Sequence, residues 1–167
     1  WYRSRGLGDV YKRQHIPFCK QSCHYCNFHF STSTKNKAEV LDAIENEIKQ
    51  KGQATNEAIS TIYFGGGTPS ILDVSEINSI IKRIYKEINV ESEVEITIEA
   101  NPDDLNKEKI INLSLTEINR LSIGVQSFID KELKIMNRAH DSKKALNSIE
   151  ISKTVSYTHL RAHETCT

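Results

Sequence analysis

The amino-acid sequence predicts an α/β fold in which parallel β-strands alternate with α-helices. Three observations lead to this prediction. Segments with apolar residues at helical spacing alternate along the chain with short β-branched segments. Candidate functional residues at 65–68, 99–101 and 126 each follow directly after one of the β-branched segments. The 167 residues, 38% hydrophobic and 26% charged, suit one globular domain.

The first half of the chain predicts helix, strand and helix in that order. Residues 38–51 carry apolar side chains at helical spacing, and a glycine follows as a stop. Residues 59–64, ISTIYF, are typical of a buried strand that runs into three glycines. Residues 74–89 predict a second helix with an isoleucine face, for which Asp73 or Ser75 is the candidate cap.

The second half continues the alternation. A strand is predicted over 94–99, a turn with a capping residue over 101–104, and a helix over 106–115. A third strand over 120–125 precedes a helix over 142–152. Strands joined by helices pair in parallel through right-handed crossovers, so their carboxyl ends meet at one edge of the sheet. Ligands bind at that edge in such folds.

The two ends of the chain differ in composition from the Ile-, Lys-, Glu- and Asn-rich middle. Residues 1–14 and 155–167 show neither helical nor strand periodicity. Both resemble translated sequencing-adapter read-through, and ordinary disordered termini are the alternative. We interpret them as artefact tails around a genuine segment, 15–154, that is the front part of a longer protein. On this interpretation the first and last strands of the fold are missing, and Cys166 has no function.

Three of the four cysteines, Cys19, Cys23 and Cys26, lie within eight residues at the spacing C-x3-C-x2-C. No signal peptide and no transmembrane segment is visible, so a cytoplasmic protein is expected, and a triplet there indicates cluster or metal ligation. Three thiolates can hold three irons of a [4Fe–4S] cluster and leave the fourth open to S-adenosylmethionine (SAM). The alternative is a zinc site with His24 or His29 as fourth ligand.

Further candidate residues follow the predicted strands. The GGGTP motif at 65–69 lets the backbone approach a ligand closely, and it lacks the Gly-Lys-Ser/Thr ending of a phosphate loop. Glu99 can accept hydrogen bonds from ribose hydroxyls, and the amide of Gln126 can bond a ligand. Arg138 can pair with a carboxylate. Each residue alone is compatible with an ordinary surface position, so the prediction depends on their combination.

The strings HIPFC-x3-C-x2-C, YFGGGTPS, IEANP and RLSIGVQSF resemble radical SAM proteins related to oxygen-independent coproporphyrinogen III oxidase. The resemblance covers nearly all of 15–154 and implies a partial (β/α)6 barrel, here truncated. It implies a [4Fe–4S] cluster and S-adenosyl-L-methionine as cofactors. The implied cluster ligands are Cys19, Cys23 and Cys26, and the implied SAM contacts are Tyr25, Gly66, Gly67, Thr68, Glu99, Gln126 and Arg138.

Phe28 separates two branches of this family. The oxidases have a fourth cysteine two residues after the third, whereas CNFHF is similar to the HemW branch of heme chaperones. This resemblance implies heme or a porphyrinogen as ligand and an electron donor such as flavodoxin or ferredoxin. The alternatives are oxidative decarboxylation of coproporphyrinogen III to protoporphyrinogen IX, and a non-catalytic zinc-binding module. The net charge is zero and no basic stripe occurs, so nucleic acid is not an expected partner.

Overall fold

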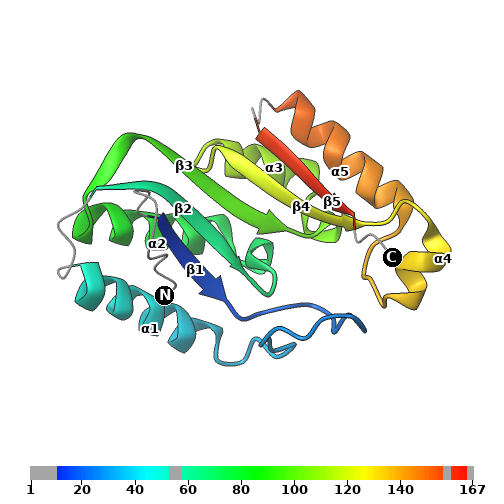
Figure 1. Cartoon of the computed structure of the whole chain (residues 1–167), viewed down its shortest axis with the longest axis horizontal. Helices are drawn as coiled ribbons and strands as arrows, with labels where there is room; N and C mark the ends of the chain where they lie inside the picture. Colours follow the sequence, from blue (N-terminus) through cyan, green and yellow to red (C-terminus); the bar gives the residue numbers. More distant parts are fainter. Residues whose placement is uncertain (1–10, 53–57, 156–158, 165–167) are drawn as a thin grey trace.

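The structure is a computed structural model that describes residues 11–52, 58–155 and 159–164. Five parallel strands form one sheet in the order β1-β2-β3-β4-β5, with β1 and β5 at its two edges (Figure 1). The strands are β1 Tyr11–Ile16, β2 Ile59–Gly66, β3 Val90–Ala100, β4 Arg120–Gln126 and β5 His159–Glu164. Strand neighbours in sequence are therefore neighbours in space, and the predicted α/β class with parallel strands is confirmed.

Helices connect the strands, and α1, α2 and α3 gather on one side of the sheet (Figure 1). The helices are α1 Lys37–Gly52, α2 Val74–Glu87, α3 Lys107–Ser114, α4 Asp130–Ile135 and α5 Ser142–Thr154. Two 3-10 turns, η1 Pro69–Ile71 and η2 Pro102–Asp104, follow β2 and β3. The four longer helices begin and end within two residues of their predicted bounds, whereas the short α4 was not predicted.

The β1 strand is a correction to the expectation that the first strand of the fold is missing. It pairs in parallel with β2, from Tyr11 opposite Thr61 to Ile16 opposite Gly66. Strand β5 pairs in the same way with β4 at the other edge. A free sheet edge offers unpaired N–H and C=O groups, so a segment can join it without any side-chain periodicity. The origin of the two tails stays a prediction, and residues 1–10 and Cys166 lie outside the described residues.

The sheet has one apolar face and one polar face. Side chains on the apolar face are fully or almost fully buried against α1, α2 and α3, and the strands contribute Ile62, Phe64, Ile96, Ile98, Leu121 and Ile123. The alternate positions are polar, and they include Thr61, Tyr63, Thr97, Glu99 and Ser122. Parallel sheets covered by helices on both faces are apolar throughout. This alternation instead suits a barrel wall, with helices outside and a polar interior.

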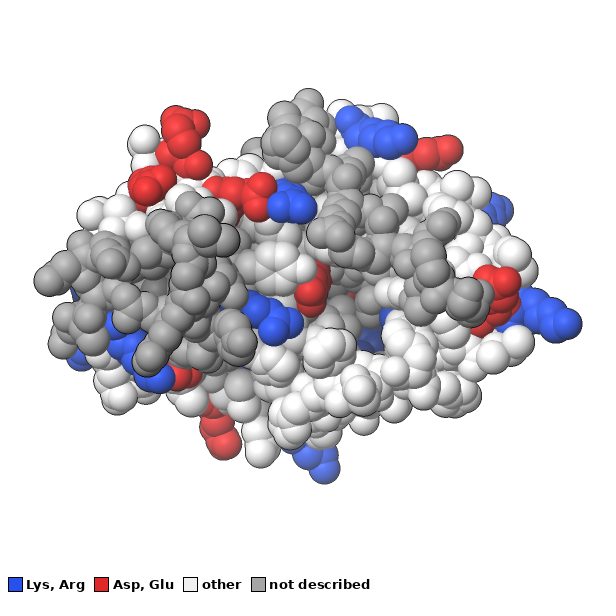
Figure 2. All heavy atoms as spheres, in the orientation of Figure 1, with Lys and Arg blue, Asp and Glu red and all other residues white. Residues whose placement is uncertain are grey.

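The surface mixes charges of both signs. Figure 2 shows Lys and Arg as well as Asp and Glu over the visible described atoms, with acidic side chains close together at the upper left. Among the described residues, no helix has the length and apolar composition that crossing a membrane requires.

Candidate cofactor site

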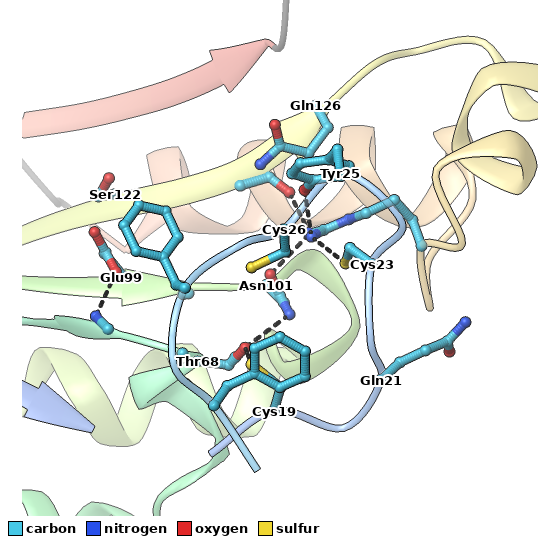
Figure 3. A pocket seen from close by; sticks show the side chains of 17 residues that line it. Cys19, Gln21, Cys23, Tyr25, Cys26, Thr68, Glu99, Asn101, Ser122 and Gln126 are labelled. Atoms are coloured by element: carbon cyan, nitrogen blue, oxygen red, sulfur yellow. Dashed lines mark hydrogen bonds between the residues drawn. The ribbon is translucent and has the colours of Figure 1, made fainter. Parts of the chain in front are cut away.

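A cavity of about 480 Å³ opens at the carboxyl ends of β2, β3 and β4. Its lining includes all ten site residues that the sequence predicted: Cys19, Cys23, Tyr25, Cys26, Gly66, Gly67, Thr68, Glu99, Gln126 and Arg138. In Figure 3 the labelled side chains of Cys23, Cys26, Asn101 and Gln126 lie around one space. The volume lies within the range of pockets that bind small cofactors. The individual roles of these residues stay predictions.

The three cysteines lie on a loop over residues 17–31, called the cysteine loop, which backbone hydrogen bonds close at its base. Cys19 N–H donates to Ser31 O at 3.0 Å, and Ser31 N–H donates to Pro17 O at 2.7 Å. Within the loop, Cys26 N–H donates to Cys23 O at 3.1 Å, which forms a tight turn. These bonds fold the cysteine loop back across the strand ends and bring its three thiols to one cavity.

Contacts with distant segments anchor the cysteine loop on two sides. Lys20 forms ion pairs with Asp103, at 3.2 Å, and with Asp104 in η2. Burial lowers the pKa of Lys20, but the hydrogen bonds and charges of Asp104 and Asp103 together outweigh burial, so the net pKa is raised. On the other side, Gln21 Nε2 donates to Asn137 Oδ1 at 2.6 Å.

His24, one of the two histidines considered as a fourth zinc ligand beside His29, belongs to the second of these anchors. His24 N–H donates to Met136 O at 3.1 Å, and its ring Nδ1 lies 2.9 Å from Ile135 O. The His24 ring therefore contacts the last residue of α4, and its Nδ1 is engaged by a backbone carbonyl.

Two of the three thiols accept hydrogen bonds from polar side chains. Thr68 Oγ1 donates to Cys19 Sγ at 3.4 Å, and Arg138 Nη1 donates to Cys23 Sγ at 3.4 Å. Burial raises the pKa of the Cys19 thiol, and the Thr68 hydroxyl opposes this effect. Arg138 Nη1 also donates to the Tyr25 hydroxyl at 3.1 Å. Burial raises the pKa of Tyr25, while the charge of Arg138 acts in the other direction.

Three thiols at one cavity are a donor set that fits an iron–sulfur cluster. Within the described part of the chain, no three His, Cys, Asp or Glu side chains are gathered so that one ion could bind them together. Tetrahedral zinc with Zn–S bonds of about 2.3 Å needs its sulfurs only about 3.8 Å apart. A cubane cluster binds each thiolate through a different iron, so it accepts more widely separated sulfurs.

The glycine motif packs directly against the cysteine loop. Gly67 N–H donates to Ile16 O at 2.8 Å, and a Cβ on Gly67 would lie 2.6 Å from Phe18 O and 3.0 Å from Cys19 Sγ. Gly66 has a φ of +119°, a backbone conformation that residues with a Cβ atom rarely adopt. The close approach of the two loops therefore depends on Gly67, and the backbone conformation before it depends on Gly66.

Glu99 is held by donors from the neighbouring strand. Tyr63 Oη donates to Glu99 Oε1 at 2.7 Å, and Gly66 N–H donates to Glu99 Oε2 at 3.1 Å. Each carboxylate oxygen can accept two hydrogen bonds, so both oxygens keep capacity for a ligand. At the end of β4, a Cβ on Gly124 would lie 3.2 Å from Gln126 Nε2, so glycine leaves room for this amide.

Asn101 belongs to the cavity wall, and the sequence predicted a turn and a cap at this position directly after the second strand. The turn is confirmed as η2, but the Asn101 side chain makes no capping bond to η2 within the described residues. Its Nδ2 donates to Thr68 Oγ1 at 3.2 Å, and its Oδ1 accepts from Arg138 Nη2 at 2.8 Å. Its place directly after the strand that carries Glu99 was the available sequence signal.

Sequence comparisons link the chain to proteins that use SAM. A sequence model of the Radical SAM superfamily matches residues 14–160. The heme chaperone HemW of Bacillus subtilis is 35% identical over 149 residues, which cover 87% of this chain and 39% of that protein. HemW of Lactococcus lactis is 36% identical over 147 residues, or 87% of this chain and 38% of that protein. The chain thus spans under two fifths of the length of these relatives.

Solved structures share the fold. The Escherichia coli coproporphyrinogen III oxidase HemN, described as a radical SAM enzyme, aligns with a TM-score of 0.82 and 27% identity. The alignment covers 91% of this chain and 36% of that one. The protein anSMEcpe with bound AdoMet and a Cp18Cys peptide aligns over 95% of this chain and 42% of its own, with a TM-score of 0.58 and 15% identity. At that identity, the similarity to anSMEcpe concerns the fold alone.

Proposed function

Because the chain belongs to the radical SAM superfamily, we propose that it binds a [4Fe–4S] cluster on Cys19, Cys23 and Cys26, with SAM beside it. The observation that carries this proposal is the meeting of the cysteine loop and the strand-end motifs in one cavity. Three thiolates account for three irons and leave the fourth to the amino and carboxylate groups of SAM. When bound, the cluster supplies the electron that breaks a carbon–sulfur bond of SAM.

The protein's own residues would bind and orient SAM in this cavity. The guanidinium of Arg138 brings positive charge to the cysteine side, where the SAM carboxylate would lie. The backbone of Gly66 and Gly67, with Thr68, would contact the methionine part. Glu99 would accept hydrogen bonds from the ribose hydroxyls.

One aromatic side chain and one amide side chain complete the proposed SAM site. Tyr25, which is 44% exposed at the cavity wall, would lie against the adenine. Gln126 lines the cavity at the carboxyl end of β4. Its amide would hydrogen-bond those polar groups of SAM that the other site residues do not contact.

For the whole protein we propose a heme-chaperone role like that of HemW, with heme or a porphyrin as the cargo. The HemW relatives at 35% and 36% identity support this proposal. So does Phe28, which lines the cavity where the oxidases are expected to carry a fourth cysteine. The electron donor would be a flavodoxin or ferredoxin. Cytoplasmic localisation is proposed because thiolate ligands persist in a reducing compartment.

Anaerobic reconstitution with iron and sulfide tests the cluster proposal. The chain is expected to become brown and to hold four irons and four sulfides, and Cys23→Ala is expected to lose most of both. Cys166→Ala is the matched control and should keep them. Equal iron and sulfide content in Cys23→Ala, or zinc bound without sulfide, would contradict the proposal.

SAM binding and the chaperone role need two further measurements. Addition of SAM is expected to change the electron paramagnetic resonance (EPR) spectrum of the reduced cluster, because SAM ligates the open iron. The full-length gene product is expected to bind hemin and transfer it to an acceptor without decarboxylating coproporphyrinogen III. Turnover of coproporphyrinogen III to protoporphyrinogen IX would establish the oxidase instead.

A further inference from the structure

Asn101 lies at the centre of a hydrogen-bond chain that joins two cysteine sulfurs. Arg138 Nη2 donates to Asn101 Oδ1 at 2.8 Å, and Asn101 Nδ2 donates to Thr68 Oγ1 at 3.2 Å. At the two ends, Thr68 Oγ1 donates to Cys19 Sγ and Arg138 Nη1 donates to Cys23 Sγ, each at 3.4 Å. Figure 3 shows these bonds as dashed lines that lead from Asn101 toward the cysteine loop.

The chemistry of the partners sets the direction of every bond in this chain. A guanidinium only donates, so Asn101 must present its Oδ1 to Arg138 and its NH2 group to Thr68. Because the Thr68 oxygen accepts from Asn101, its single proton remains available for Cys19. If the Asn101 amide were flipped, its NH2 group would face the N–H groups of Arg138. Its oxygen would then face Thr68 and would take the hydroxyl proton that Thr68 otherwise donates to Cys19.

Backbone and side-chain contacts hold Asn101 in this position. Its N–H donates to Ser70 Oγ at 3.1 Å, and Ser70 Oγ donates to Asp104 Oδ2 at 2.6 Å. Thr68 and Ser70 are 4% and 1% exposed, so water has little access to these bonds. Contacts within the protein therefore hold Asn101 in this position.

We propose that Asn101 is a positioning residue that directs hydrogen bonds onto two cluster ligands and so raises the reduction potential of the cluster. Asn101 does not itself touch a sulfur; it acts through Thr68 on Cys19 and through Arg138 on Cys23. Hydrogen bonds to ligand sulfurs withdraw electron density and stabilise the reduced cluster. The inference rests on the proposed function, because it requires the cluster to be bound.

Substitution Asn101→Asp reverses one bond of the chain. Both carboxylate oxygens only accept, so the Thr68 hydroxyl must donate to the new carboxylate and can no longer donate to Cys19. The midpoint potential of the reconstituted cluster is expected to shift to more negative values, measured by EPR-monitored redox titration. Roughly tenfold weaker SAM binding is also expected, since Arg138 becomes engaged by a full negative charge.

Variants of Thr68 separate the lost hydrogen bond from the added charge. Thr68→Val removes the hydroxyl without adding charge and should also shift the potential to more negative values, while Thr68→Ser should keep the wild-type potential. The double variant Thr68→Val/Asn101→Asp should shift the midpoint potential by less than the sum of the shifts in the two single variants, because both substitutions act on the same bond. Equal potentials in Thr68→Val and Thr68→Ser would overturn the inference, even if Asn101→Asp takes up no cluster.

Asn119→Asp is the matched control. Asn119 also bonds on both sides, accepting from Ile96 N–H and donating to Val94 O, each at 2.8 Å, but it does not line the cavity. This variant should be less stable and keep the wild-type potential. If the wild-type chain takes up the cluster and Asn101→Asp has the same midpoint potential, the inference is overturned and the proposed function is not. A chain that takes up no cluster overturns the proposed function and, with it, the inference.

Discussion

At the residue scale, the carboxylate of Glu99 is positioned by strand β2. The Tyr63 hydroxyl donates to one oxygen and the Gly66 N–H donates to the other, so contacts within the protein orient the side chain. A side chain ordered in advance loses less conformational entropy on binding. Tyr63 is thus part of the proposed SAM site without facing SAM itself.

Tyr63→Phe is expected to change the alkaline stability of the protein. Burial, together with the bond to Glu99, raises the pKa of Tyr63 to about 12, so the folded state favours the neutral phenol. The resulting stability is present below the ordinary tyrosine pKa of about 10 and is lost as the pH rises toward 12. Urea midpoints at pH 9 and pH 11 should therefore differ less in Tyr63→Phe than in the wild type.

Tyr85→Phe is the control for this prediction. Tyr85 is 42% exposed on α2, so removal of its hydroxyl should leave most of the alkaline decline in place. An alkaline decline that is as large in Tyr63→Phe as in the wild type would show that the bond to Glu99 contributes nothing.

At the scale of elements, the cysteine loop is fastened to the turn after β3. The Asp103 and Asp104 side chains are 8% and 3% exposed, and Lys20 is the cation that pairs with both. Asp103 Oδ1 is buried and makes no hydrogen bond within the described part of the chain, so the charge of Lys20 is important there. The two elements that bracket the cavity are joined by this contact.

Lys20→Met is expected to destabilise the fold by roughly 1–3 kcal/mol, because it leaves buried carboxylates without their cation. The loss is smaller than for a fully buried pair, since Lys20 itself is 46% exposed. Lys51→Met removes a surface pair with Glu47, at 3.4 Å, and should cost no more than about 0.5 kcal/mol. Urea unfolding compares the two variants, and equal losses would contradict the role given to Lys20.

At the scale of the whole molecule, the apolar face of the sheet forms the buried core and the polar face carries the residues of the proposed site. The apolar face buries Ile62, Ile96 and Leu121 under helices, while the alternate positions carry Tyr63, Glu99 and other polar groups toward the cavity side. Because side chains alternate along a strand, one segment can serve both purposes.

Ile96→Ala should therefore destabilise the fold by about 2–4 kcal/mol, because it opens a cavity at a position with 0% exposure. Ile111→Ala removes the same atoms from an α3 side chain that is 39% exposed, and it should cost less than about 1 kcal/mol. Denaturant titration measures both. Similar losses at the two positions would mean that the apolar face is not the main source of stability.

The sequence by itself determined the alternation of helices and strands, the cysteine spacing and ten of the residues that line the cavity. These features are written locally, as periodicity along an element or as a motif directly after a strand. Only the tertiary structure decided that Asn101 bonds Arg138 and Thr68, that Tyr63 holds Glu99, and that Lys20 meets two acids. Those contacts join residues 33 to 84 positions apart, and no local pattern encodes them. The β1 strand also became visible only in the sheet, because backbone pairing formed it without a side-chain pattern of its own.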